Sequence, residues 1–492
     1  MCDDGLVMGL SRYRRYIFWL FTLGCITTAG LVTFYAFGYR YSRERGIFIY
    51  SGSITVNSLP QSVDIAIDNE PLSPQRYGVL NQTIHITGLM PGEHLLSVSA
   101  PGYRPWSKRV TVQSGVSSEF WNIILTRTDY PGVALPDTTG TSRIYPHPNS
   151  ELFALAKELP NETSVVVFDR TTQTKREVFA RSDTTFDLVT SENFEWSPKG
   201  KKLLLPLIEH GNHIYFIVNV TDGTTEKLSD LVPGLVPASA RWNATGNEEL
   251  IFLAGSSLYR FDTADNQGPS LLAQNVRTYE ITDDYIYTVS RETGSLSRFR
   301  NNSNGENQTE ITPAIGEDLG TNDYVLDVYD EERIVLLEKA GEKRLFVYNQ
   351  SSEKNYGFQE IATGIERFQF SNDGKKIMFA STNEIGVYFT RAWDVQPRRA
   401  ENEILQIARF SEPIANTVWS EDYEHILFTR GNTLKIIELD GRSGRAISDI
   451  KSFAATPSQV LPLFAENRLF IVIPDKDIDS IVFPEPQGLF GQ

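Results

Sequence analysis

One phrase recurs eight times after residue 140: an apolar or aromatic residue, a polar turn, then a run of β-forming residues. The clearest copies are anchored at Trp196, Trp242, Phe370 and Trp419, and weaker copies centre on Tyr145, Ile281, Val328 and Leu463. Successive anchors lie 39 to 51 residues apart, the length of one four-stranded propeller blade. Because one blade cannot bury its own apolar faces, the repeats must stack into a single body. The repeat predicts an architecture and leaves the ligand open.

The composition agrees with a turn-rich β protein. Hydrophobic residues make up 40% of the chain and aromatic residues 11%, which excludes wholesale disorder. Proline (24) and glycine (35) are plentiful, as many turns require. The net charge of −16 repels phosphate backbones. We therefore expect no nucleic-acid partner.

An uncharged apolar run extends from Tyr16 to Phe37 and is flanked by aromatic residues at both ends. At helical rise, a run of this length spans roughly 33 Å, enough to cross a bilayer core. It predicts a single-pass transmembrane helix at 16–37, after a cytoplasmic tail (1–15) and before a linker (38–50). A cleaved signal peptide would have a shorter apolar run and a small-residue cleavage site. Lipidation of Cys25 is a weaker alternative, because Thr22-Leu-Gly-Cys25 loosely resembles a lipoprotein processing site.

The orientation of this helix is not decided by flanking charge. Three arginines precede it and three follow it: Arg12, Arg14, Arg15, Arg40, Arg43 and Arg45. Long domains translocate largely regardless of such charges, so we expect the chain after residue 45 to lie outside the cytoplasm. Its soluble part has no cysteine and must rely on burial. Potential N-glycosylation sites occur at Asn81, Asn161, Asn219, Asn243, Asn301, Asn307 and Asn349.

In residues 51–127, apolar and polar residues alternate as they do in β-strands. Six short strands with period two begin near Ser53, Val63, Thr83, His94, Lys108 and Phe120, with turn signals between them. This pattern predicts a small antiparallel β-sandwich.

The stretch Leu89-Met-Pro-Gly-Glu-His-Leu-Leu-Ser-Val-Ser-Ala-Pro-Gly-Tyr-Arg-Pro-Trp106 resembles the second half of the PEGA domain. In the first half, Pro60-Gln-Ser-Val63 stands in place of the Pro-Glu-Gly-Ala that names the family. The resemblance implies an envelope or surface module with no known catalytic residues.

After a linker at 128–140, the segment 141–486 resembles TolB-type and WD-like propellers, whose repeats carry an aromatic-Ser-Pro-Asp-Gly-Lys phrase. Trp196-Ser-Pro-Lys-Gly-Lys matches it best. We expect seven or eight blades, with seven if the Ile281 unit is irregular. The last unit is short, and a strand within Tyr130–Leu135 is the candidate for completing it by pairing the chain ends.

The usual catalytic signatures do not occur: there is no Gly-x-Ser-x-Gly, His-Glu-x-x-His, Walker loop or Cys-x-x-Cys. His210-Gly-Asn-His213 could in principle hold a metal, but a hairpin turn is the commoner explanation. Asp475, Asp477 and Asp479 have the alternate spacing of a calcium loop. Ser480 and Pro486 replace its usual glycine and final glutamate, which favours a charged hairpin. We therefore assign no catalytic, cofactor or metal residue.

The leading hypothesis is a membrane-anchored, non-enzymatic protein whose propeller recognises an envelope protein or a glycan. One alternative is an extracytoplasmic propeller enzyme that acts on glycans through carboxylates, and another is a structural envelope component. The enzyme predicts two or more carboxylates converging with a histidine or tyrosine in the central channel.

Overall fold

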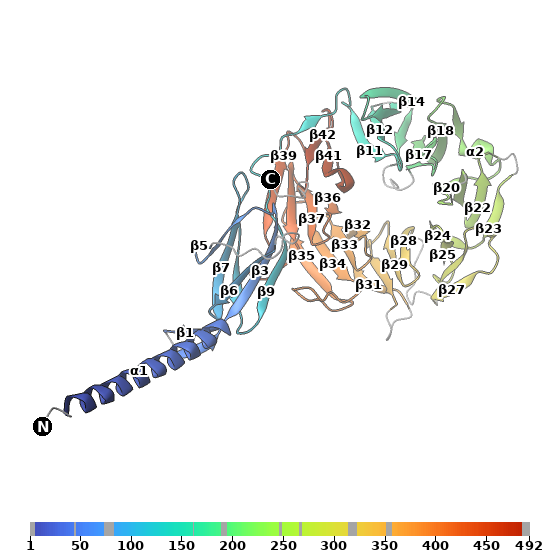
Figure 1. Cartoon of the computed structure of the whole chain (residues 1–492). Coiled ribbons are helices and arrows are strands. Elements are labelled where there is room, and N and C mark those ends of the chain that lie inside the picture. Colours follow the sequence, from blue (N-terminus) through green and yellow to red (C-terminus); the bar gives the residue numbers. More distant parts are fainter. Residues whose placement is uncertain are drawn as a thin grey trace. The chain divides into compact units, whose positions relative to one another are not determined.

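The structure is a computed structural model of the full chain (Figure 1). It describes residues 5–43, 46–72, 83–160, 162–187, 194–245, 248–264, 268–312, 322–350 and 357–484. These fall into two compact units. One is built around Met1–Thr128 and includes the connection Asp440–Ala446; the other comprises Asp129–Leu439 and Ile447–Pro486.

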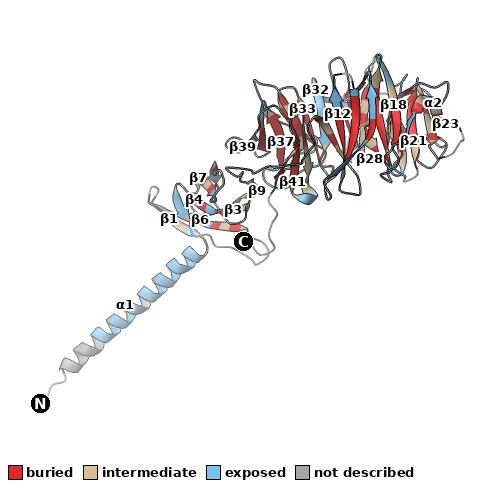
Figure 2. Cartoon of the chain, turned by 90° about the horizontal axis from the view of Figure 1, so that it is seen from above, coloured by how far each residue is buried: buried red, intermediate tan, exposed pale blue. Residues whose placement is uncertain are grey.

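The first unit begins with helix α1, Gly5–Ala36. Its Tyr13–Ala36 stretch has a mean hydropathy of 1.8 and is long and apolar enough to cross a membrane; no other helix among the described residues is. The side chains from Tyr13 onward are almost all exposed, as the pale blue helix in Figure 2 shows. Gly38, with φ of 89°, follows the helix in the left-handed conformation that commonly ends helices.

A short hairpin follows α1 directly, with β1 at Tyr39–Ser42 and β2 at Ile47–Tyr50. Its aromatic side chains are exposed and contact one another and the helix end. The ring centroid of Phe34 lies 5.1 Å from that of Tyr39 and 6.1 Å from that of Phe48.

Residues 51–127 form two packed sheets. One has the order β6 (Ile84–Leu89), β3 (Gly52–Leu59) and β9 (Ser117–Ile124), and the other β5 (Glu70–Leu72), β4 (Asp64–Ile67), β7 (Gly92–Ser99) and β8 (Trp106–Val112). The alternating pattern is confirmed most plainly in β8, where every second residue is buried. The buried faces form one apolar core that includes Ile54, Leu96 and Trp106.

One pairing in this sandwich differs from the expected antiparallel arrangement. Strands β3 and β9 pair in parallel, with Ile54 opposite Ser118. Strand β9 follows β8, which belongs to the other sheet. The chain therefore crosses from one sheet to the other between β8 and β9, and β9 then lies beside β3. Alternation shows which face is buried but not the direction of the neighbouring strand, and so the sequence pattern could not reveal this.

The second unit is a ring of eight antiparallel sheets (Figure 1). The first four are β11 (Thr141–Pro146), β12 (Leu152–Leu159), β13 (Glu162–Asp169) and β14 (Thr174–Ser182); β15 (Thr184–Phe186), β16 (Glu195–Trp196), β17 (Lys202–Glu209), β18 (Asn212–Asn219) and β19 (Thr225–Lys227); β20 (Pro237–Trp242), β21 (Glu249–Ala254), β22 (Ser257–Asp262) and β23 (Ser270–Ala273); and β24 (Val276–Ile281), β25 (Tyr285–Ser290), β26 (Leu296–Arg300) and β27 (Thr309–Thr312). A single helical turn, α2 (Leu228–Leu231), follows β19.

The remaining four sheets are β28 (Tyr324–Asp330), β29 (Arg333–Glu338), β30 (Leu345–Asn349) and β31 (Gln359–Ala362); β32 (Ile365–Phe370), β33 (Lys376–Ser381), β34 (Glu384–Phe389) and β35 (Ile404–Arg409); β36 (Ile414–Trp419), β37 (His425–Arg430), β38 (Thr433–Glu438) and β39 (Ile447–Ser452); and β40 (Gln459–Leu463), β41 (Arg468–Val472) and β42 (Asp479–Val482) with β10 (Val133–Ala134). A short 3₁₀ helix, Phe464–Glu466, joins β40 to β41. The Ile281 unit is a regular four-stranded sheet, so the described chain forms eight blades rather than seven.

The chain ends close the ring, as the short last unit suggested. Val133 in β10 pairs with Ser480 in β42, and Ala134 pairs with Asp479. The backbone N–H of Leu135 also donates to Ile478 O at 2.8 Å. The last blade is therefore built from three C-terminal strands and one N-terminal strand.

The four clear anchors occupy one equivalent position. Trp196, Trp242, Phe370 and Trp419 each end a strand that pairs with the long second strand of their blade. Each lies opposite the first apolar residue of the buried run in that partner strand. Two weaker anchors are displaced by one residue. The equivalent residues are Pro146, opposite Phe153, and Pro462, opposite Leu469, not Tyr145 and Leu463. Because proline occupies the equivalent position in both units, the apolar or aromatic residue beside it places the repeat one residue out of register.

Two of the anchor tryptophans link their blade to the preceding one by a hydrogen bond. The Trp419 indole Nε1–H donates to Gln369 O at 3.0 Å, and the Trp196 indole donates to Tyr145 O at 3.0 Å. Both rings are buried. Trp196 and Trp419 thus combine apolar packing with a directional bond across the blade boundary.

The second lysine of the Gly-Lys-Lys phrase links its blade to the following one. Lys202 Nζ lies 2.9 Å from a Glu248 carboxylate oxygen, and Lys376 forms the equivalent ion pair with Glu424. Lys376 is almost completely buried. A buried charge of this kind is tolerated only when it is paired and hydrogen-bonded.

The glycine of the phrase is required by a close approach of the preceding blade. At Gly374, φ is 64° and an added Cβ would lie 2.3 Å from the Tyr329 ring; at Gly200, φ is 67° and the atom would lie 1.8 Å from His147. Tyr329 completes its contact by donating its hydroxyl hydrogen to Asn372 O at 3.0 Å. Only glycine permits both the turn and the ring above it.

A matched pair of substitutions tests the role of the anchor bond. Trp419 and Trp242 are both buried (2% and 5% exposed), but the Trp242 indole Nε1 has no hydrogen-bond partner among the described residues. We expect Trp419→Phe to lower the free energy of unfolding by about 1 kcal/mol more than Trp242→Phe, because only the former loses a satisfied hydrogen bond. Urea unfolding of the full chain in detergent measures both values. Equal losses would contradict a stabilising role for the Trp419 bond.

Candidate functional site

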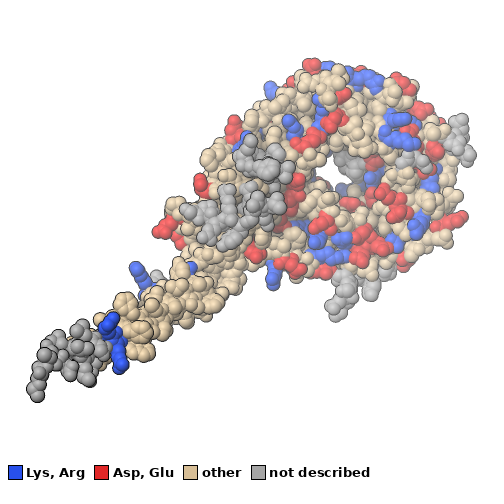
Figure 3. Space-filling view, viewed as in Figure 1, with Lys and Arg blue, Asp and Glu red and all other residues tan. Residues whose placement is uncertain are grey.

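The first strands of the blades surround a central cavity of about 850 Å³. Residues of β11, β20, β24, β28, β32 and β36 line it, together with the β29–β30 connection. Figure 3 shows the ring open at its centre. Because these strands alternate their side chains with period two, residues one and three places before each anchor are aligned on the same side.

A charged cluster occupies the position one residue before the anchors in four successive blades. We call Glu195, Arg241, Glu280 and Asp327 the acidic tier. Arg241 bridges its neighbours: its Nε lies 2.6 Å from Glu195 Oε1 and its Nη1 lies 2.7 Å from Glu280 Oε2. The tier thus holds three carboxylates and one guanidinium.

Burial dominates the titration of this tier. It raises the pKa of Glu280 to about 7; Arg241 opposes the rise and Asp327 adds to it. Burial also raises the pKa of Asp327, against the attraction of Arg241. The side chains of Arg241 and Glu280 nevertheless keep 27% and 14% exposure, because the channel brings water to them.

A basic level lies two residues earlier along the strands. Arg143 on β11 and Arg367 on β32 are each three places before the anchor position of their blades, and both line the cavity. We call them the arginine pair. Lys343 lies in the same cavity but is paired with Glu366 at 2.7 Å.

Sequence reasoning missed the acidic tier and the arginine pair, although a signal for both was present. All six residues lie at fixed offsets from the repeat anchors. An alignment of the eight copies would have shown charged residues recurring at these offsets.

The channel has only part of the group of residues that the enzyme hypothesis predicts. Four carboxylates, those of Glu280, Asp327, Glu338 and Glu366, line one cavity, but no histidine or tyrosine is among the described residues that line it. The adjacent Tyr279 points away, since its hydroxyl donates to Ile251 O at 2.9 Å and it packs in the interface between blades.

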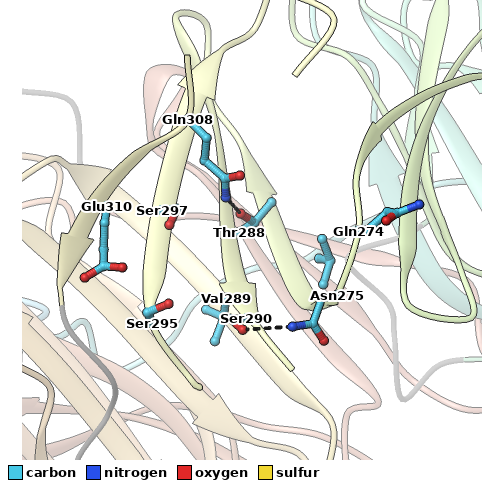
Figure 4. Close-up of a pocket in the computed structure, with 10 residues that line it drawn as sticks. Gln274, Asn275, Thr288, Val289, Ser290, Ser295, Ser297, Gln308 and Glu310 are labelled. Carbon is cyan, nitrogen blue, oxygen red and sulfur yellow. Dashed lines mark hydrogen bonds between the residues drawn. The ribbon is translucent and has the colours of Figure 1, made fainter. Parts of the chain in front are cut away.

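A smaller cavity of about 340 Å³ adjoins the fourth blade (Figure 4). Its lining is nearly all hydroxyl and amide groups, and some of these bond to each other: Asn275 Nδ2 donates to Ser290 Oγ at 3.4 Å, and Gln308 Nε2 donates to Thr288 Oγ1 at 3.5 Å. Among the described residues that line it, none has an aromatic side chain to stack on a sugar ring. The lining residues come from the fourth blade and the connection that enters it.

The metal candidates are engaged in structural contacts. His210 and Gly211 have φ of 52° and 80° and form the turn between β17 and β18, while His213 Nδ1 contacts Asp187 Oδ2 at 2.8 Å. Asp477 accepts hydrogen bonds from Thr138 N and Thr139 Oγ1. Asp479 pairs with Lys451 at 2.7 Å, and Asp475 sits in a turn with φ of 57°. The described residues contain no group of three or more potential metal ligands.

Three of the potential glycosylation sites are inaccessible in the folded state. Asn243, Asn301 and Asn349 are buried. Asn301 Nδ2 donates to Asn243 Oδ1 at 2.7 Å, and Asn349 Nδ2 donates to Thr390 O at 2.8 Å. These amides stabilise blade connections. Asn81 and Asn161 lie outside the described residues.

Both parts of the chain resemble known proteins. Residues 51–121 match the PEGA domain family. The C-terminal WD40 domain of Sif2 has a TM-score of 0.46 at 12% identity and covers 72% of this chain and 98% of its own length. The Dos1 propeller has a TM-score of 0.46 at 12% identity, with 73% and 96% covered. Hsv2p of Kluyveromyces lactis scores 0.34 at 14% identity, with 57% and 88% covered.

No match was found among curated proteins. The propeller assignment rests on the order of the sheets.

The raised carboxyl pKa values predict a specific pH dependence of stability. Since the pKa of Glu280 rises from 4.5 to about 7 on folding, its contribution to the free energy of unfolding declines as pH rises through that interval. Asp327→Asn removes one carboxyl group with a raised pKa and lowers the pKa of Glu280, which Asp327 raises. The variant should therefore gain stability relative to the wild type between pH 4.5 and 7.5, as measured by urea unfolding. Asp330→Asn, on the surface beside Arg333, is the control. A gain that does not grow with pH would contradict the expectation.

Proposed function

We propose that this chain, in which a PEGA domain is followed by an eight-bladed propeller, is a membrane-anchored extracytoplasmic binding protein whose ligand enters the propeller channel. The observation that carries the proposal is the charged lining of the 850 Å³ cavity. Charged side chains at its centre do not contribute to the apolar contacts between blades, so their presence favours a role in recognition.

The region after α1 supports an anchor rather than a cleaved signal. The hairpin β1–β2 follows the helix at once and exposes Tyr41, Phe48 and Tyr50. The Arg40 guanidinium lies 3.5 Å from the centroid of the Tyr35 ring. Aromatic residues with an adjacent arginine are typical of the membrane–water interface. If the helix were removed, this aromatic surface would lose its contact with Phe34.

The enzyme remains the second candidate because of one observation. A carboxyl group with a pKa near 7, such as Glu280, can act as a general acid or base at neutral pH. Its direct ion pair with Arg241, however, engages one carboxylate oxygen. Burial inside a structural ion-pair network also shifts pKa values without catalysis.

The orientation can be tested with single cysteines, because the natural chain has only Cys2 and Cys25. Asn304→Cys adds a thiol in the exposed turn between β26 and β27. We expect a membrane-impermeant maleimide to label this thiol on intact cells, since the propeller lies outside. Cys2, on the other side of the helix, should be labelled only after the cells are opened.

The reverse pattern would show that the propeller faces the cytoplasm. Recovery of the chain in the carbonate-soluble fraction would contradict the anchor. Cys25→Ser in the same background removes the only thiol within the apolar run and serves as the control for labelling inside the bilayer.

The absence of catalysis is tested separately. We expect no turnover of ester, glycoside or peptide substrates by the full chain purified in detergent. A reproducible activity that Glu280→Gln reduces by on the order of a hundredfold or more, as for loss of a general acid or base, would replace the binding function with an enzymatic one. Glu306→Gln, at an exposed site outside the channel, should leave any such activity unchanged.

A further inference from the structure

We infer that the arginine pair, Arg143 and Arg367, binds a phosphate or carboxylate group of the ligand that enters the channel. This rests on the proposed binding function and specifies the ligand chemistry. Both guanidinium groups belong to the same cavity, and each comes from the third position before the anchor position of its blade.

The arginine pair differs from the other arginine of the channel in having no acidic partner. Arg241 contacts two carboxylates directly. Arg143 and Arg367 make neither an ion pair nor a hydrogen bond with any described residue; the carboxylate next in sequence, that of Glu366, is taken by Lys343 at 2.7 Å.

The two guanidinium groups are also close enough to repel one another. Burial lowers the pKa of Arg367, and the positive charge of Arg143 lowers it further. Like charges inside a ring of this kind destabilise the folded state unless an anion lies between them. Glu366 attracts Arg367 and opposes this effect on its pKa, but less than Arg143 adds to it, and the Glu366 carboxylate is already paired with Lys343.

The cavity surface beside the two arginine strands includes polar side chains that are held by hydrogen bonds. Asn416 on β36 donates from Nδ2 to Pro457 O at 3.0 Å, and the Ser458 hydroxyl donates to Ser142 O at 3.0 Å. Both residues line the same cavity as the arginine pair. The guanidinium groups therefore project beside a rigid surface, which limits the entropy lost when a ligand binds.

The chemistry of the pair favours an oxyanion. A guanidinium presents a planar fork of N–H donors that matches carboxylate and phosphate oxygens in bidentate geometry. The acidic tier lies two residues farther along the strands, roughly 7 Å away. It repels a second anion, so the anionic group of the ligand is confined to the arginine level.

Binding can be measured on the full chain in a neutral detergent at low ionic strength. The probes are inorganic pyrophosphate and citrate, which distinguish a phosphate from a carboxylate source, with glucose as the uncharged control. We expect at least one anion to bind the wild type in calorimetry and to raise its unfolding temperature. Arg143→Gln and Arg367→Gln should each weaken binding by on the order of tenfold or more, as expected for a lost charge-assisted hydrogen bond.

The control variant is Arg409→Gln, whose side chain is 80% exposed and pairs with Glu384 outside the channel. It should bind as the wild type does. Without anion, the two arginine-pair variants should unfold at the wild-type temperature or above it, because a repulsion has been removed. A lower temperature in both would show a structural role and overturn the inference.

Equal binding by Arg367→Gln and Arg409→Gln, or no binding of either anion by the wild type, would also overturn it. None of these outcomes changes the labelling expected for Asn304→Cys on intact cells. Failure of the anion site is therefore distinguishable from failure of the proposed membrane-anchored location.

Discussion

The contact between successive blades is the constraint on which the propeller depends. It has two directional parts that the repeated phrase supplies. The anchor tryptophan donates its indole hydrogen to the preceding blade, as Trp419 does to Gln369, and the lysine of the phrase reaches an acid in the following blade, as Lys202 does to Glu248. Apolar packing on both faces provides most of the stabilisation, whereas these bonds determine the register between blades.

Ring closure gives the inner strands a property that no single blade has. When eight blades stack, the edge of each first strand faces a shared, water-filled axis. Charged residues can therefore occupy positions that would be costly between blades, since the channel hydrates them. Arg241 keeps 27% exposure while making two ion pairs. The site arises because the fold leaves these positions free of a packing role.

The charges in the channel are separated by level. Carboxylates predominate one residue before the anchors, and the arginine pair lies two residues earlier. A ligand with one anionic end would meet attraction and repulsion in a fixed order along the axis, which favours one orientation of binding. The sandwich at 51–127, by contrast, is organised around an apolar core.

The periodic features of this protein follow from its sequence. The repeat of Trp196 and its equivalents predicts the blades. The run from Tyr16 to Phe37 predicts a helix able to cross a membrane. The short last unit predicts the pairing of the chain ends. These depend on local patterns of apolar and turn residues, which are present in the chain whatever its partners are.

Which residues converge depends on contacts that form only in the folded protein. The parallel pairing of β3 with β9 and the one-residue displacement to Pro146 both depend on contacts distant in sequence. Arg143 and Arg367, more than two hundred residues apart in the chain numbering, meet in one cavity because ring closure brings the first and sixth blades to the same axis. A strand's alternation reveals that it has two faces, but the neighbouring blades determine which face is buried and which side chains reach the channel.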